Sequence, residues 1–100
     1  MTLSDFKATL REATPPAVAP ALVALWHDAK GDWDEAHETA QAIEDVTGAW
    51  VHAYLHRKEG DASNAAYWYR RAGRDVAGSG VSLDDEWSQI ATELLSGRTR

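Results

Sequence analysis

Cysteine is absent from this chain of 100 residues. Without a thiol, the protein can form no disulfide, no thiolate metal site and no cysteine nucleophile. A long apolar run is absent as well: the longest, "PPAVAPALVALW", contains all three prolines, is too short to cross a bilayer and lacks the basic flank of a signal peptide. We therefore expect a cytoplasmic protein that makes no use of a membrane.

Positive charge is also scarce. Ten Lys and Arg residues stand against 16 Asp and Glu residues, which gives a formal net charge of -6. Binding to nucleic acid or to anionic lipid depends on an excess of basic residues, so this balance argues against both. Motifs for catalysis are missing too: there is no glycine-rich phosphate loop, and "HETAQ" at His37 lacks the second histidine of a zinc-protease motif. We expect no enzyme activity, no catalytic residue and no cofactor.

Alternating apolar and polar residues, the pattern of a half-buried strand, do not occur, whereas helical spacing recurs along the whole chain. The length predicts one domain with one core. The expected helices span residues 4–13, 20–30, 33–46, 49–59, 62–77 and 82–97. Thr47 and Gly48 are expected to break the chain between the third and fourth helices. The sequence contains five tryptophans, most of which should lie in the core because their side chains are large and apolar.

An internal repeat organises the middle of the chain. The stretches "HDAKGDWDEA" and "HRKEGDASNA" begin at His27 and His56, 29 positions apart, and share a Gly-Asp pair in the same place. Glycine ends a helix in the left-handed conformation and aspartate caps the next one. The repeated unit is therefore a helix, a Gly-Asp turn and a second helix, and two such units can bury their apolar faces by stacking.

Residues 20–77 resemble the tetratricopeptide repeat and its Sel1-like relatives. "GDWDEA" is similar to the turn between helices A and B of such a repeat, and "GDASNAAYWYRRA" is similar to a B helix. The resemblance implies an all-α domain in a small bacterial family, with antiparallel helical hairpins at 20–48 and 49–77 stacked as a short right-handed array. Segment 1–19 would precede the array and a helix at 82–97 would cap it. The resemblance also implies that a peptide or protein partner binds in a groove lined by the A helices.

The stretch "YWYRRAGR" suggests where such a partner would bind. On a helix over 62–77, Trp68 and Tyr69 face the core, while Tyr67 and three arginines share the opposite side. Arginine can hold a carboxylate with two parallel hydrogen bonds, which favours an acidic partner. Cations near a helix C-terminus also offset the helix dipole, so a purely structural role stays open. The expected partner-binding residues are Trp50, Arg57, Tyr67, Arg70, Arg71 and Arg74.

Two alternatives accompany this prediction. In "HAYLHRKE", the spacing places His52, His56 and Glu59 on one helical face, a set that could bind a metal ion, with His27 or His37 as a further ligand. The charged residues at 28–45 are mostly acidic and those at 57–74 mostly basic, so opposed faces could also join two copies in a homodimer. The primary prediction assigns no metal ligand and a non-catalytic, partner-binding function.

Overall fold

The computed structural model describes residues 1–78 and 80–97, and these residues form helices and turns without any strand. The helices are α1 (Leu3–Ala8), which runs into a 3-10 turn at Thr9–Arg11, α2 (Pro20–Ala29), α3 (Trp33–Gln41), α4 (Val46–Glu59), α5 (Ala62–Arg71) and α6 (Leu83–Ser96). The all-α fold class is confirmed. None of the helices in these ranges has both the length and the apolar content that crossing a bilayer requires.

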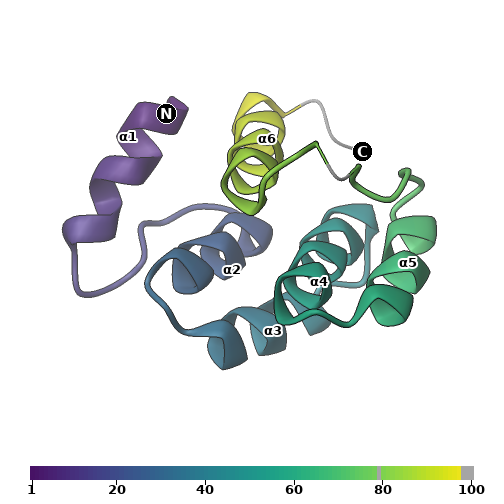
Figure 1. Cartoon of the computed structure of the whole chain (residues 1–100). Coiled ribbons are helices and arrows are strands. Elements are labelled where there is room, and N and C mark those ends of the chain that lie inside the picture. The colour runs from purple at the N-terminus through teal and green to yellow at the C-terminus, as the bar shows by residue number, and fades with distance from the viewer. Residues whose placement is uncertain (79, 98–100) are drawn as a thin grey trace.

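Consecutive helices in the middle of the chain pack as hairpins. α2 packs against α3, α4 packs against α5, and contacts between α3 and α4 join the two pairs (Figure 1). α4 lies at the centre, because it contacts α2, α3, α5 and α6. The arrangement agrees with the two helical hairpins that the repeat predicts.

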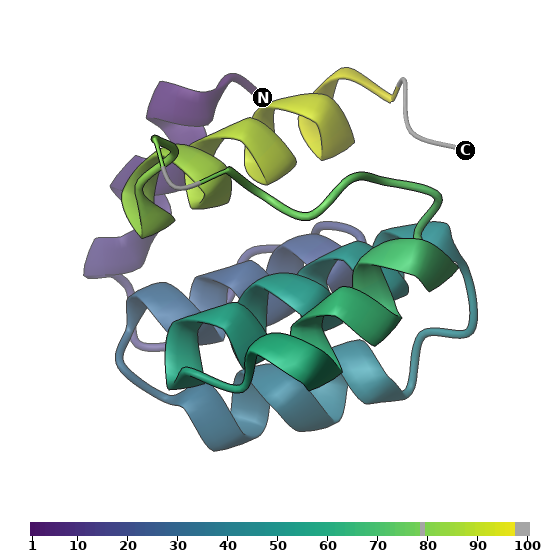
Figure 2. The same ribbon diagram turned by 45° about the vertical axis from the view of Figure 1, so that its right-hand side comes forward.

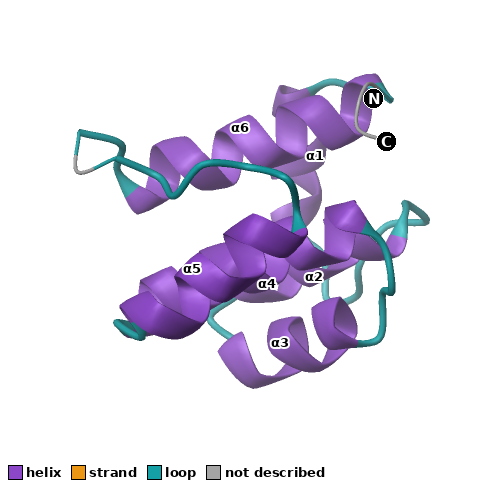
Figure 3. Ribbon diagram, turned by 90° about the vertical axis from the view of Figure 1, so that its right-hand side faces the viewer, coloured by secondary structure: helices purple, strands orange, loops and turns teal. Residues whose placement is uncertain are grey.

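α6 covers one side of these hairpins. It packs across α2 and α4, which are the first helices of the two pairs, and it also contacts α1. Figures 2 and 3 show α1 and α6 together on the same side of the hairpins. The indole of Trp87 on α6 stacks on Phe6 with 5.7 Å between ring centroids, and its Nε1 donates a hydrogen bond to the carbonyl of Leu25 at 2.9 Å. The face that α2 and α4 turn toward α6 is therefore filled by the chain itself.

The two Gly-Asp turns have the same geometry, as the repeat predicts. Gly31 and Gly60 have φ angles of 86° and 91°, a region that favours glycine. The backbone amides of Asp32 and Asp61 each donate to a histidine carbonyl five residues earlier, both at 2.9 Å. Each aspartate side chain then caps the following helix, by accepting from Glu35 N and Asn64 N respectively. These local contacts form the same turn twice.

The end of α5 differs from the prediction. A helix was expected to continue to residue 77, but α5 ends at Arg71 because Gly73 adopts a φ of 71° and the amide of Arg74 bonds back to the carbonyl of Tyr69 at 3.0 Å. The same turn, a left-handed glycine followed by an amide that bonds to a carbonyl five residues earlier, thus occurs a third time here. Arg74 and Val76 therefore lie outside the helix on which the sequence analysis placed them.

The boundary between α3 and α4 also differs. The third helix ends at Gln41 instead of residue 46, and the expected break at Thr47 and Gly48 is wrong because both residues lie inside α4. The carboxylate of Asp45 caps α4 by accepting from the amides of both residues, at 3.0 and 3.1 Å. A Cβ at Gly48 would lie 2.5 Å from the carbonyl oxygen of Ile43. The glycine permits close packing and does not end a helix.

The core runs between the hairpins and α6. Three of the five tryptophans, Trp26, Trp50 and Trp87, are buried, as expected for most of them. The remaining two, Trp33 and Trp68, are half-buried and pack against the edge of the core. The largest fully buried side chains are Tyr69, Phe6, Leu25, Leu55, Ile90 and Val51. The two half-buried tryptophans thus lie where core and surface meet, which is where a site can form.

Candidate functional site

The exposed face of α5 carries three of the residues that the sequence analysis selected. Tyr67 is 43% exposed, and Arg70 and Arg71 are exposed beside it. The guanidinium of Arg71 donates to the hydroxyl of Tyr67 at 3.2 Å and lies 5.8 Å from the centroid of that ring and 5.4 Å from that of Trp68. Among the described residues, neither Arg70 nor Arg71 forms an ion pair with a carboxylate. These two cations stay available to a partner.

The other three selected residues join the hairpins to α6. Arg57 donates to Glu86 at 2.8 Å and to the carbonyl of Val81. Arg74 pairs with Glu93 at 2.7 Å, and its guanidinium lies 3.3 Å from the ring centroid of Trp50. Trp50 is 3% exposed. The structure thus divides the predicted set into an exposed group on α5 and a group engaged in packing.

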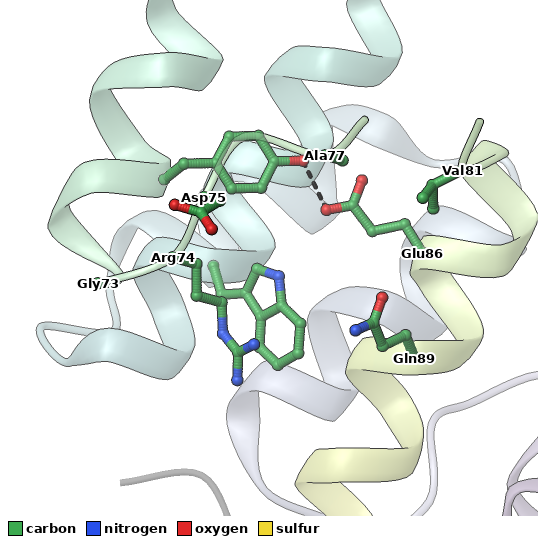
Figure 4. A pocket seen from close by; sticks show the side chains of 9 residues that line it. Gly73, Arg74, Asp75, Ala77, Val81, Glu86 and Gln89 are labelled. Carbon is green, nitrogen blue, oxygen red and sulfur yellow. Dashed lines mark hydrogen bonds between the residues drawn. The ribbon is translucent and has the colours of Figure 1, made fainter. Parts of the chain in front are cut away.

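A cavity of about 410 Å³ lies between the loop after α5 and the start of α6. Its lining includes Trp50, Tyr69, Gly73, Arg74, Asp75, Ala77, Val81, Glu86 and Gln89 (Figure 4). Both carboxylate oxygens of the buried Glu86 already have partners, because Oε2 accepts from Tyr69 at 2.5 Å, drawn as a dashed line, and Oε1 accepts from Arg57. Burial and this hydrogen bond raise the pKa of Tyr69. The polar groups here serve to hold α6.

A second buried carboxylate holds α4 to α2. Asp28 is 3% exposed and accepts from the Tyr54 hydroxyl at 2.9 Å and from the Lys58 ammonium at 2.9 Å. Burial, followed by the charge of Asp28, raises the pKa of Tyr54. The sequence analysis did not identify Asp28 or Glu86, because nothing in their local pattern distinguishes a buried acid from the many exposed ones.

Three histidines form a compact group between α3 and α4. His37 lies on α3, while His52 and His56 lie one turn apart on α4. One nitrogen from each ring can be chosen so that all three lie within 4.8 Å of one another, and Nε2 of His37 and Nε2 of His52 are 2.9 Å apart. Ring centroids are separated by 4.6 to 5.1 Å. We call His37, His52 and His56 the histidine cluster.

Glu59 and two tryptophans surround the histidine cluster. Oε1 of Glu59 contacts Nδ1 of His56 at 2.6 Å. Trp33 stacks on His37 with 4.9 Å between centroids, and Trp68 stacks on His52 with 3.9 Å. In the metal-binding alternative drawn from the sequence, Glu59 was predicted as a direct ligand together with His52 and His56. The structure instead places His37 as the third member and Glu59 on Nδ1 of His56.

The fourth histidine of the chain stays apart. His27 precedes its Gly-Asp turn as His56 does, but its ring meets the edge of Trp26 at 5.3 Å between centroids. Of the two histidines named as additional candidates, the structure brings His37 to the cluster and leaves His27 in the first hairpin.

Burial lowers the pKa of two members of the histidine cluster, His52 and His37. It lowers the pKa of His52 to about 4, with smaller contributions from the charges of His37 and His56. Burial and the charge of His56 also lower the pKa of His37. Both rings are therefore neutral near pH 7, which leaves a lone pair on each imidazole.

A second cavity, of about 460 Å³, lies beside His52 and Arg71. Its lining includes Gln41, Ile43, Glu44, Asp45, Val46, Ala49, His52, Trp68 and Arg71. His52 and Arg71 therefore line the same cavity. Comparison of the chain with protein-family models, with curated proteins and with solved structures finds no match. The resemblance to tetratricopeptide repeats stays a prediction.

Proposed function

We propose that the protein is a non-catalytic helical module that binds an acidic segment of a peptide or protein on the exposed face of α5. One observation carries the proposal. Arg70 and Arg71 are exposed and free of ion pairs among the described residues, whereas Arg57, Lys58 and Arg74 each pair with a carboxylate of the chain. In a protein with a net charge of -6, two adjacent unneutralised arginines form a local site for negative charge.

The chemistry of this face suits carboxylate recognition. The guanidinium of Arg71 rests on Tyr67 and Trp68, so part of its conformational freedom is already lost before a ligand arrives. Less entropy is then lost when it forms two parallel hydrogen bonds to a carboxylate. Tyr67 adds an exposed aromatic ring, a residue type enriched in binding surfaces.

The proposed location differs from the groove that the tetratricopeptide resemblance implies. α6 packs across α2 and α4, so their shared face is covered. α5, the second helix of its hairpin, presents its arginines on the outside. A partner that binds here needs no displacement of α6.

Fluorescence anisotropy with a labelled peptide of alternating glutamate and glycine tests the proposal. We expect saturable binding that weakens with added salt, and no binding of the matching lysine and glycine peptide, because the attraction is electrostatic. The double variant Arg70→Glu, Arg71→Glu should lower the affinity at least about tenfold. The double variant Lys7→Glu, Arg11→Glu is the control, since it makes the same change in net charge at two exposed residues of another face.

Equal losses in the two double variants would show that net charge alone matters and would contradict the proposed site. Reversing Arg74 as well would be unsuitable, because Arg74 is engaged with Trp50 and Glu93 and its loss would disturb the fold. Light scattering on the same samples distinguishes a homodimer: a salt-sensitive dimer of a wild type that does not bind the peptide would assign the basic face to a second copy.

A further inference from the structure

We propose that His37, His52 and His56 bind one divalent transition-metal ion. In this site Glu59 orients the ring of His56 through its contact with Nδ1. The inference is independent of the α5 partner site, and it revises the sequence-based prediction, which assigned no metal ligand. It rests on where the four side chains lie relative to one another. Three imidazoles from two helices converge, and a carboxylate contacts Nδ1 of one of them.

The spacing of the nitrogens fits one ion. Zinc to nitrogen distances of about 2.0 to 2.1 Å in a tetrahedral site place two ligand nitrogens about 3.3 Å apart. The histidine cluster has a nitrogen pair at 2.9 Å, and all three chosen nitrogens lie within 4.8 Å. Binding one ion requires the closest pair to open slightly, and we expect small rotations of the rings to adjust the other two distances.

The type of donor selects the class of metal. Imidazole nitrogen suits zinc, nickel, cobalt and copper, whereas magnesium and calcium prefer oxygen donors. The chain has no cysteine, so a thiolate cannot compete for the ion. Three protein nitrogens leave a fourth position for water or another small ligand. Of the three histidines, His52 lines the cavity of about 460 Å³.

The contacts that orient the histidine rings resemble those found around the ligands of metal sites. Histidine ligands commonly contact a carboxylate through the second ring nitrogen, which fixes the ring and its tautomer. Glu59 makes this contact with Nδ1 of His56 at 2.6 Å and leaves Nε2 for an ion. Trp33 stacks on His37, and its own Nε1 is held by the carbonyl of Leu55 at 2.9 Å.

A hydrogen bond between His37 and His52 is the competing explanation for their short contact. It accounts for one nitrogen pair, at 2.9 Å. It does not account for the position of the His56 ring or for the contact of Glu59 with that ring. The two explanations differ in what the purified protein does with added metal.

Isothermal titration of untagged protein, stripped with a chelator and then freed of it, tests the proposal with zinc and cobalt salts. We expect one equivalent of zinc to bind, no binding of magnesium at the same concentrations, and a visible absorption spectrum for the cobalt form that indicates nitrogen ligands in a four-coordinate site. His37→Gln should weaken zinc binding at least about 100-fold because it removes a ligand. Glu59→Gln should weaken it about 10- to 100-fold, the usual effect of losing such a partner.

His27→Gln is the matched control, because it removes a half-buried histidine outside the histidine cluster and should leave zinc affinity unchanged. His37 and Glu59 are the chosen positions because neither is fully buried, and circular dichroism of each variant establishes that the helices are retained. Stoichiometric binding that survives in folded His37→Gln, or that disappears in His27→Gln, would overturn the proposal. So would a wild type that binds no zinc. The peptide-binding assay for α5 reports on a different set of residues. The outcome of the zinc titration therefore neither supports nor contradicts the proposed peptide site.

Discussion

The hydroxyl of Tyr69 on α5 donates a hydrogen bond to the buried carboxylate of Glu86 on α6 at 2.5 Å. The bond joins the second hairpin to the helix that covers α2 and α4. Arg57 on α4 donates a second hydrogen bond to the same carboxylate. A buried carboxylate is costly unless it is hydrogen-bonded and paired, so the position of α6 depends on these contacts.

Tyr69→Phe should lower the free energy of unfolding by about 1 to 3 kcal/mol, because it removes one donor from a buried charged acceptor. Urea denaturation followed by circular dichroism measures the change. Tyr67→Phe is the control: its hydroxyl is exposed, and we expect a change within about 0.5 kcal/mol. If the two substitutions had the same effect, the bond to Glu86 would not be holding α6.

Gly48→Ala should destabilise the protein even though alanine is the better helix former by about 1 kcal/mol. The added Cβ would lie 2.5 Å from the carbonyl oxygen and 2.6 Å from the Cβ of Ile43, which requires a shift of backbone. Overpacking of this kind typically costs about 1 to 3 kcal/mol. Gly78→Ala is the control, since a Cβ there meets nothing within 4 Å. A stabilised Gly48→Ala variant in a thermal melt would refute the close packing of Gly48 on Ile43.

Alkaline pH should destabilise the fold through Tyr54 and Tyr69. Burial raises the pKa of both phenols above the ordinary value of 10.0, as do the contacts with Asp28 and Glu86. The unfolded chain then loses these protons first, so the stabilising contribution is complete below pH 10 and is lost as pH rises above it. Urea unfolding between pH 8 and about pH 11 measures the decline. In Tyr69→Phe the decline should be smaller, because one of the two groups is gone.

Arg74→Ala should cost about 1 kcal/mol of stability, because the guanidinium stacks on the ring of Trp50 at 3.3 Å and pairs with Glu93. Arg70→Ala, at an exposed position without an ion pair among the described residues, should change stability by less than about 0.5 kcal/mol. Thermal unfolding of the two variants gives the comparison. A larger loss of stability for Arg70→Ala than for Arg74→Ala would contradict a stabilising role for the contacts of Arg74.

The sequence predicted what depends on neighbouring residues. The Gly-Asp turns at Gly31 and Gly60 were predicted because a left-handed glycine and an aspartate cap act within a few residues. The exposure of Tyr67, Arg70 and Arg71 followed from helical spacing alone. Gly73, by contrast, was missed as a helix end because no aspartate follows it, and this error placed Arg74 on the wrong surface.

The candidate metal site was predicted only in part. His52 and His56 are one turn apart on a single helix, so their shared face follows from helical geometry. His37 joins them because α3 packs on α4, and sequence spacing does not specify how two helices meet. Glu59 has the right spacing for either role, and only the side-chain positions place it on Nδ1 of His56.

By itself the sequence determined the helical class, the repeated turns and the exposed basic face of α5, because each follows from contacts within one or two helical turns. Only the tertiary structure decided three other features: α6 covers α2 and α4, Glu86 is held between Tyr69 and Arg57, and His37 meets His52. These features join residues that are 15 or more positions apart. Such contacts depend on which apolar faces bury one another, a property of the whole packed chain that no local pattern contains.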